Sequence, residues 1–154
     1  MYNNNCKKSN QFNSFHNWKF GTLNVRSGKE KLEGARIYEI TKEVSRAKLS
    51  FCVLQEVRHR NSGKKIIELN NGERYVFLWC GKKKRRDAGV GILIKMERGL
   101  AFSEPDFTDP RVMTLNMNIH GFKIRLVIGY SPTNIDTRFE LFSDYRKMVS
   151  TLFP

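Results

Sequence analysis

The feature that most constrains the fold is the order of apolar patterns between residues 18 and 57. Residues 18–25 (WKFGTLNV) alternate in polarity and end in polar side chains, which predicts a strand. Residues 33–48 carry apolar side chains at spacings of three and four, which predicts one buried helix face made of Ile37, Ile40, Val44 and Ala47. Residues 51–57 (FCVLQEV) open with four apolar side chains, as a buried strand does. A strand, a helix and a second strand in this order predict a βαβ unit.

The rest of the chain predicts further strands and a second helix. Strands are indicated at 75–80, 89–94, 111–119 and 122–130, and the turn His120-Gly121 predicts a hairpin between the last two. Helical spacing continues through 135–152, at Phe139, Phe142, Tyr145, Met148 and Leu152. We expect a sheet-rich α/β or α+β domain with mainly one mixed, mostly antiparallel sheet, whose one face is covered by both helices.

The strand at 51–57 leads directly into a carboxylate. Four apolar residues are followed by Gln55 and Glu56. A lone buried carboxylate is costly, so Glu56 must reach water, a cation or a metal. In α/β proteins, ligands bind at the carboxyl ends of the strands. Position alone therefore makes Glu56 a candidate site residue.

The charge of the chain favours polyanionic partners. Twenty-eight Lys and Arg against fifteen Asp and Glu give a net charge of +13. This excess favours nucleic acid first and an anionic membrane second, whereas solubility alone needs less charge. One basic run consists of Lys82, Lys83, Lys84, Arg85 and Arg86. It could contact a phosphate backbone, bind a nuclear import receptor or be a solvated turn.

Other features predict a protein inside the cell. The three cysteines are far apart and form no C-x-x-C pair, and Cys52 and Cys80 lie in apolar runs where we expect them to be buried. Residues 1–16 resemble a flexible leader without the apolar segment of a signal peptide. No apolar run reaches the length of about 18 residues that a membrane helix needs. We expect an intracellular protein, nuclear in preference to cytoplasmic, without a membrane partner.

Four segments in order resemble the first half of a known family. They are Gly21–Arg26 (GTLNVR), Val53–Arg58 (VLQEVR), Arg86–Ile94 (RDAGVGILI) and Gly129–Asn134 (GYSPTN). The set resembles the endonuclease/exonuclease/phosphatase family, also called deoxyribonuclease-I-like, and its retrotransposon and craniofacial-development-protein-2-like branch. The resemblance covers about residues 18–152 and implies the N-terminal half of a four-layer α/β sandwich. Each segment alone is a weak signal, and their order carries the resemblance.

The resemblance implies a role for each matching residue. Glu56 would anchor Mg²⁺ or Mn²⁺, Asn24 would orient the metal site, and Tyr130 would contact the scissile phosphate. The resemblance therefore predicts that these three side chains meet at one edge of the sheet. A hard cation that keeps several waters can use one carboxylate as its main protein ligand. Arg111 and Asn134 are weaker candidates for phosphate contacts, together with the basic run 82–86. The histidines His16, His59 and His120 match no catalytic position of the family and are expected at the surface or in turns.

Each role has a purely structural alternative. Glu56 could pair with Arg58 or Arg26 at the edge of the sheet. Asn24 could close its strand as an Asx turn. Tyr130 could be an ordinary core aromatic at a strand end. Arg26 also stands where apurinic endonucleases tend to carry an acidic residue, which implies a metal site with one carboxylate.

The segments of the family's second half do not occur in this chain. The family places a Gly-Asp-x-Asn segment and a late Ser-Asp-His segment there, and Ser143-Asp144-Tyr145 imitates the latter too early and with Tyr for His. We expect a leader at 1–16 and a partial domain at 17–154, with one apolar sheet face uncovered. Such a chain would be a fragment, a degenerate transposon remnant or one half that needs a partner.

Three functions remain open at this point. The first is an incomplete or inactive metal-dependent phosphodiester hydrolase that acts on nucleic acid, DNA before RNA. The second is a basic nucleic-acid-binding module without catalysis, and the third is a fragment of a phosphoinositide or other phosphoester phosphatase. Hydrolysis needs the cation, an oriented water and a base. We therefore expect DNA binding, weak Mg²⁺ binding and little or no cleavage.

Overall fold

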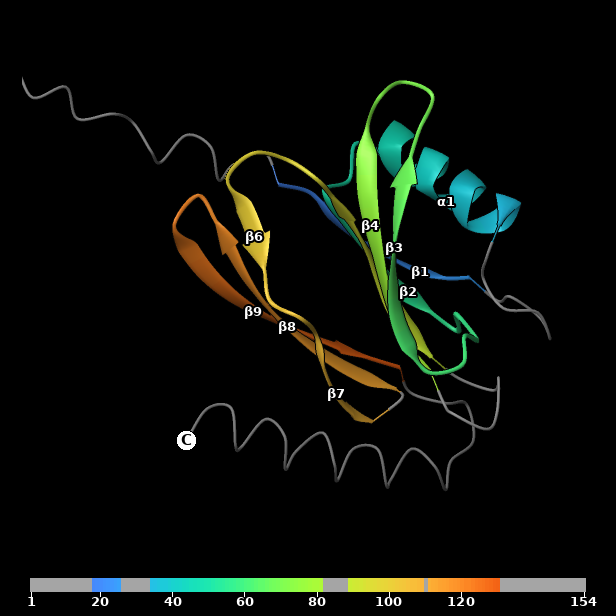
Figure 1. Cartoon of the computed structure of the whole chain (residues 1–154), viewed down its shortest axis with the longest axis vertical. Coiled ribbons are helices and arrows are strands. Elements are labelled where there is room, and N and C mark those ends of the chain that lie inside the picture. The colour runs from blue at the N-terminus through green and yellow to red at the C-terminus, as the bar shows by residue number, and fades with distance from the viewer. Residues whose placement is uncertain (1–17, 26–33, 82–88, 110, 131–154) are drawn as a thin grey trace, which may run out of the picture.

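The computed structural model of the chain describes residues 18–25, 34–81, 89–109 and 111–130, and has the α/β class expected from the sequence (Figure 1). Within these ranges it contains one helix and two sheets. In chain order the elements are β1 Phe20–Asn24, α1 Ala35–Arg46, β2 Phe51–Gln55, β3 Ser62–Glu68, β4 Arg74–Cys80, β5 Val90–Lys95, β6 Leu100–Phe102, β7 Asp106–Asp109, β8 Val112–Ile119 and β9 Phe122–Gly129.

The first sheet has five strands in the order β1-β2-β5-β4-β3. β1 and β2 are parallel neighbours and α1 connects them, which confirms the predicted βαβ unit. The pairs β2–β5, β5–β4 and β4–β3 are antiparallel. The sheet is therefore mixed and mostly antiparallel, as expected.

The second sheet is built around β8. On one side β8 pairs with β6 and β7, and it also pairs with β9 along its whole length. The hairpin β8–β9 turns at His120 and Gly121, both with positive φ, at 49° and 92°. Two such residues suit a tight turn between twisted antiparallel strands, so the predicted hairpin is confirmed.

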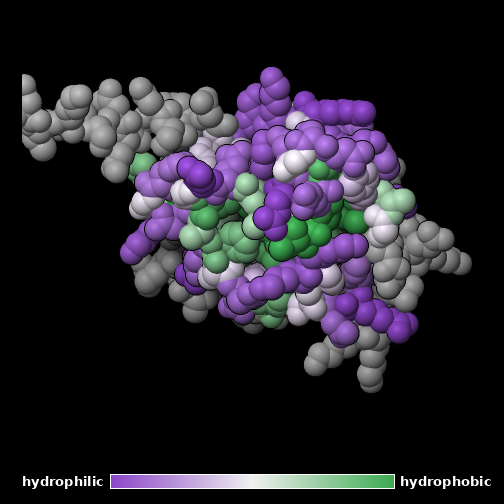
Figure 2. Space-filling model, turned by 45° about the horizontal axis from the view of Figure 1, so that its top comes forward, coloured by the Kyte–Doolittle hydropathy of each residue, from purple (hydrophilic) through white to green (hydrophobic). Residues whose placement is uncertain are grey.

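The described elements form three layers: α1, the first sheet and the second sheet. The buried face of α1 includes Ile37 and Val44, which pack with Leu54 and Phe77 on the first sheet. The other face of the first sheet packs against β8 and β9 through a second core cluster, which includes Ile92 and, from β8, Met113 and Leu115. Figure 2 shows apolar side chains reaching the surface in the middle of one face, between hydrophilic ones.

The expectation of mainly one sheet was wrong. β6 to β9 pair among themselves and form a separate sheet that covers the face of the first sheet opposite α1. That face was expected to lie uncovered, and in the described part of the chain it is the inner wall of a core. The alternation at 111–119 predicts a strand with one buried face, but it does not say which strands are its neighbours.

The larger differences from the expected elements are the end of β2 and three strands that the sequence did not predict. β2 ends at Gln55 rather than at residue 57, because Glu56 has a φ of 58°, which a strand cannot continue. β3 was missed, since Ile67 is its only buried side chain. β6 and β7 were missed because they are only 3 and 4 residues long. The expected leader at 1–16 and the expected helix at 135–152 lie outside the described residues.

Within the described ranges, no helix has the length and apolar character needed to cross a membrane. Cys52 and Cys80 are both buried, as the sequence predicts.

Candidate functional site

The candidate site begins with the parallel pairing of β1 and β2. Their register sets Asn24 opposite Gln55, and the Val25 N–H donates to the Gln55 carbonyl at 3.0 Å. Both strands therefore end at the same edge of the sheet, where α/β folds bind ligands. Glu56 is the first residue beyond this pair.

The segment 56–59 turns sharply as it leaves β2. Glu56 and Arg58 both have left-handed backbones, with φ of 58° and 53°, and the Val57 between them is fully buried. The Val57 N–H donates to the Gly89 carbonyl at 3.3 Å. Left-handed conformations of residues other than Gly are strained and concentrate at functional sites. Here the turn directs Glu56 toward Asn24 and away from the strand direction.

The structure brings Asn24, Glu56 and Tyr130 together, as predicted. The Asn24 Nδ2 donates to the Glu56 Oε1 at 2.8 Å, and the Tyr130 hydroxyl donates to the same oxygen at 3.3 Å. Asn24 and Glu56 come from the ends of β1 and β2, whereas Tyr130 follows β9 of the second sheet. The site therefore joins the two sheets.

Arg58 provides a third contact to the carboxylate. Its guanidinium nitrogen NH2 lies 3.3 Å from the Glu56 Oε2, and the two side chains are 25% and 17% exposed. This is one of the structural alternatives weighed for Glu56, and it coexists with the contacts to Asn24 and Tyr130. The other alternative partner, Arg26, lies outside the described residues.

These contacts shift the pKa values of Glu56 and Tyr130 in opposite directions. The hydrogen bond from Asn24 is the main cause that lowers the pKa of Glu56, and Arg58 and Tyr130 lower it further against the effect of burial. Burial and the negative charge of Glu56 raise the pKa of Tyr130. At neutral pH, Glu56 is therefore an ionised acceptor and Tyr130 a protonated donor.

The chemistry of the site fits a hard divalent cation that keeps most of its water. One ionised carboxylate and one neighbouring amide are oxygen-bearing groups of the kind that Mg²⁺ and Mn²⁺ use. Among the described residues, no three His, Cys, Asp or Glu side chains gather to form a metal-binding group. Glu56 would therefore be the main protein ligand, and its ion pair with Arg58 would compete with the cation.

Comparison with known proteins does not identify the chain. No protein-family model matches the sequence, and no curated protein matches it either. The family named from the four segments therefore stays a proposal.

Two glycines let the chain pass close to the segment 56–59. A Cβ on Gly81 would lie 1.8 Å from the His59 carbonyl oxygen, and one on Gly89 would lie 2.9 Å from the Cys80 carbonyl oxygen. These glycines border the stretch that carries Lys82, Lys83, Lys84, Arg85 and Arg86. The basic run itself lies outside the described residues, but the chain leaves and re-enters the described part beside the candidate site.

The remaining predicted site residues divide into two groups. Arg111 lies beside the site, because its carbonyl accepts a hydrogen bond from the Tyr130 N–H at 2.9 Å. Asn134 and the tripeptide Ser143-Asp144-Tyr145 lie outside the described residues. Tyr130 also packs against the core between the two sheets. The alternative role considered for it, a core aromatic at a strand end, is therefore partly correct.

Sequence reasoning gave too little weight to Arg58 and misplaced His59. Arg58 follows Glu56 by two residues, a spacing that often sets two side chains on the same side of an extended chain. His59 was expected at the surface or in a turn, but it is buried and its ring lies 4.6 Å from that of Trp79. His120 lies exposed in the hairpin turn, as expected, and His16 falls outside the described residues.

Proposed function

We propose that the chain carries the cation-anchoring site of a metal-dependent phosphodiester hydrolase of the endonuclease/exonuclease/phosphatase type, which acts on nucleic acid. The observation that supports this most is the meeting of Asn24, Glu56 and Tyr130 around one ionised carboxylate. These residues come from three segments that lie far apart in the sequence. They are also the three to which the resemblance assigns the site.

Each residue has a distinct task in this proposal. Glu56 binds Mg²⁺ or Mn²⁺, and Asn24 holds the carboxylate in place through its 2.8 Å hydrogen bond. Tyr130 stays protonated, and its hydroxyl, which donates to Glu56 in the structure, would donate instead to a phosphate oxygen once a cation holds the carboxylate. A bound divalent cation supplies Lewis-acid stabilisation of the phosphate and of the leaving oxygen.

Nucleic acid is the substrate class that the charge favours. The chain has a net charge of +13, and the basic run 82–86 is bordered by glycines packed beside the site. Positive charge around a phosphodiester site raises affinity for a polyanion and makes binding sensitive to salt. DNA is the first candidate, and the nucleus the expected compartment.

A non-catalytic nucleic-acid-binding module is the second candidate. The observation that favours it is the ion pair of Glu56 with Arg58, which neutralises the carboxylate without a metal. In the described ranges, Glu56 also gathers no group of further carboxylates or histidines that could supply a base. We therefore expect cation and DNA binding with little or no cleavage from this chain.

The deciding experiment is a Mn²⁺ titration of the full chain by calorimetry. Glu56→Gln keeps the size of the side chain and removes its charge, so Mn²⁺ affinity should fall at least tenfold, or about 1.4 kcal/mol. The matched control is Glu39→Gln on α1, an exposed carboxylate paired with Lys42, which should change nothing.

DNA binding provides the second readout. Glu56→Gln should bind DNA as well as the parent chain or slightly more tightly, because it removes a negative charge. Equal Mn²⁺ affinity in Glu56→Gln and the parent chain would refute the cation site and leave the binding module. Strong Mg²⁺-dependent nicking of a plasmid, lost in Glu56→Gln, would show instead that the chain is a complete nuclease.

A further inference from the structure

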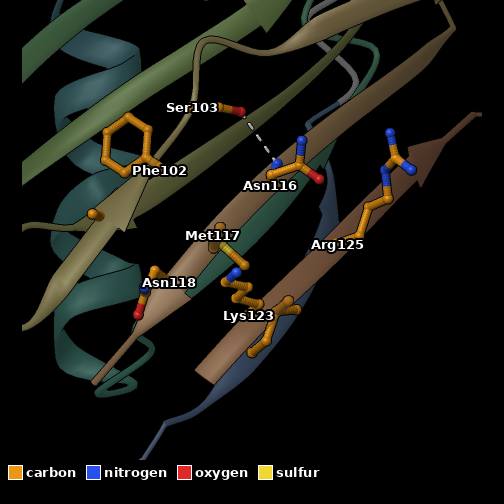
Figure 3. Close-up of a pocket in the computed structure, with 9 residues that line it drawn as sticks. Phe102, Ser103, Asn116, Met117, Asn118, Lys123 and Arg125 are labelled. Carbon is orange, nitrogen blue, oxygen red and sulfur yellow. Dashed lines mark hydrogen bonds between the residues drawn. The ribbon is translucent and has the colours of Figure 1, made fainter. Parts of the chain in front are cut away.

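A groove on the second sheet lies apart from the candidate site. Its volume is about 450 Å³, and it runs across β6, β8 and β9 (Figure 3). Four of its polar residues form two cross-strand pairs, Asn116 with Arg125 and Asn118 with Lys123. All four side chains are exposed.

These four residues lie on the outer face of the second sheet. Side chains alternate between the two faces of a strand, and the intervening Met117 and Ile124 pack into the inter-sheet core. Asn116, Asn118, Lys123 and Arg125 therefore point away from the first sheet. They form two successive rows, each with one amide and one cation.

The groove offers hydrogen-bond donors and positive charge. None of the nine lining residues is acidic. Lys123 and Arg125 take part in none of the ion pairs between described residues. The Asn118 Oδ1 accepts the Gly121 N–H at 2.8 Å, which leaves its Nδ2 as the donor to a ligand. A site with cations and amide donors but no acid selects an anion.

The acidic residues that neighbour the lining within the described chain do not cancel this charge. Glu104 follows the lining residue Ser103, but its carboxylate is 2.7 Å from the Lys64 Nζ. Asp106 lies opposite Thr114, the next outward-facing position of β8 beyond Asn116, and is outside the lining. The positive groove therefore ends at Asp106.

We propose that this groove binds the phosphate backbone of a nucleic acid strand, as a contact surface separate from Glu56. Its two amide and cation rows are two residues apart, or about 7 Å along the strands. This spacing is close to that of successive phosphates in an extended strand, and a single small anion would use only one row.

The proposed groove ligand, nucleic acid, is also the substrate class of the proposed function. Binding in the groove does not require a cation at Glu56. Arg125 and Tyr130 are five residues apart on and just after β9, so they are separated by about 17 Å. That distance equals only about two and a half steps of about 7 Å along an extended strand. Only a very short oligonucleotide can therefore fill the groove without reaching the carboxylate.

The test measures binding of a short fluorescent single-stranded DNA to the full chain at several salt concentrations. The variant is the double substitution Lys123→Gln with Arg125→Gln. The control is Lys65→Gln with Arg98→Gln, which removes the same charge from exposed positions outside the groove. For two lost phosphate contacts, the slope of log K against log salt should fall by about 1.4 in the groove variant. The control should keep the slope and the affinity of the parent chain.

Three further outcomes are informative. Equal losses in the groove variant and its control would overturn the proposal, because charge alone would then explain binding. Loss of binding to phosphatidylserine vesicles, with DNA binding kept, would also overturn it and indicate a membrane surface. The groove variant should keep the Mn²⁺ affinity of the parent chain, so a failed cation site would leave this proposal standing. If the double variant does not fold, Asn116→Asp places one repelling charge at an exposed groove position and should weaken binding in the same way.

Discussion

At the scale of single residues, Arg58 decides how readily Glu56 can accept a cation. Its NH2 nitrogen lies 3.3 Å from Oε2, whereas Asn24 and Tyr130 both contact Oε1. The Arg58 Nε is buried and has no hydrogen-bond partner among the described residues. Arg58 is thus a counter-ion that is only partly satisfied, and a metal must displace it from Oε2.

Arg58→Gln should therefore raise the Mn²⁺ affinity of the chain at least threefold. The Asn24 hydrogen bond is the larger cause of the lowered Glu56 pKa, so the carboxylate stays ionised without Arg58. Calorimetric titration measures the change, with the exposed Arg60→Gln as the control that removes a nearby charge without touching Glu56. Weaker Mn²⁺ binding in Arg58→Gln would show that Arg58 positions the carboxylate and does not compete for it.

At the scale of elements, the end of β4 supports the turn that presents Glu56. Gly81 follows β4, its N–H donates to the Asn61 carbonyl at 2.9 Å, and it leaves no room for a Cβ beside the His59 carbonyl. Gly89, just before β5, accepts the Val57 N–H. The segment 56–59 is thus held on both sides by backbone of the first sheet.

Gly81→Ala should destabilise the fold by about 1–3 kcal/mol, the usual cost of overpacking, and should also weaken Mn²⁺ binding. The added methyl group can be accommodated only by moving the segment that carries Glu56. Gly72→Ala is the control: its φ of 81° strains an alanine, but nothing lies within 4 Å of the added Cβ. It should lower stability in urea without changing Mn²⁺ affinity, and a Gly81→Ala chain with normal Mn²⁺ binding would contradict the expectation.

The sequence predicted elements where burial imposes a pattern. Mostly buried strands such as β4 and β5, and the amphipathic α1, carry that pattern in their own residues. β3 carries almost none, because six of its seven residues are exposed or half-buried. The convergence of Asn24 and Glu56 could be predicted because parallel neighbours end at one edge. The pairing of Glu56 with Arg58 could be given only as an alternative, because it depends on the left-handed backbones of these two residues, which no local pattern indicates.

At the scale of the whole molecule, two core layers enclose the first sheet, and each contains a cysteine. Cys52 belongs to the layer beneath α1 and Cys80 to the layer between the sheets. Burial raises the pKa of Cys52 to about 11. At pH 8, about one Cys52 thiol in a thousand would be ionised even if a reagent could reach it.

Thiol labelling should therefore report on unfolding of the entire domain. In a Cys6→Ser background, a disulfide reagent at pH 8 should label neither Cys52 nor Cys80 until denaturant unfolds the chain. Both should then react along the same denaturant transition as the circular dichroism signal. Labelling of Cys80 at lower denaturant than Cys52 would show that the two sheets separate before the first sheet unfolds.

The division into two sheets could not be predicted, because pairing partners are a long-range choice. Both β5 and β8 have strongly buried sequences, and nothing in either sequence excludes the other as a neighbour. Tyr130 was therefore expected at an edge of the same sheet as Glu56. Its hydroxyl instead reaches the carboxylate from the second sheet.

The hydrogen bond from Tyr130 to Glu56 depends on the relative position of the two sheets. Asn24 moves with Glu56 because their strands are hydrogen-bonded neighbours, but Tyr130 moves with β9. A shear of about 1 Å between the layers would break the 3.3 Å contact of Tyr130 and leave the 2.8 Å contact of Asn24 intact. Tyr130 would then lose its acceptor first. The chemical shifts of its ring in an NMR spectrum would therefore change when the sheets move relative to each other, before any strand separates.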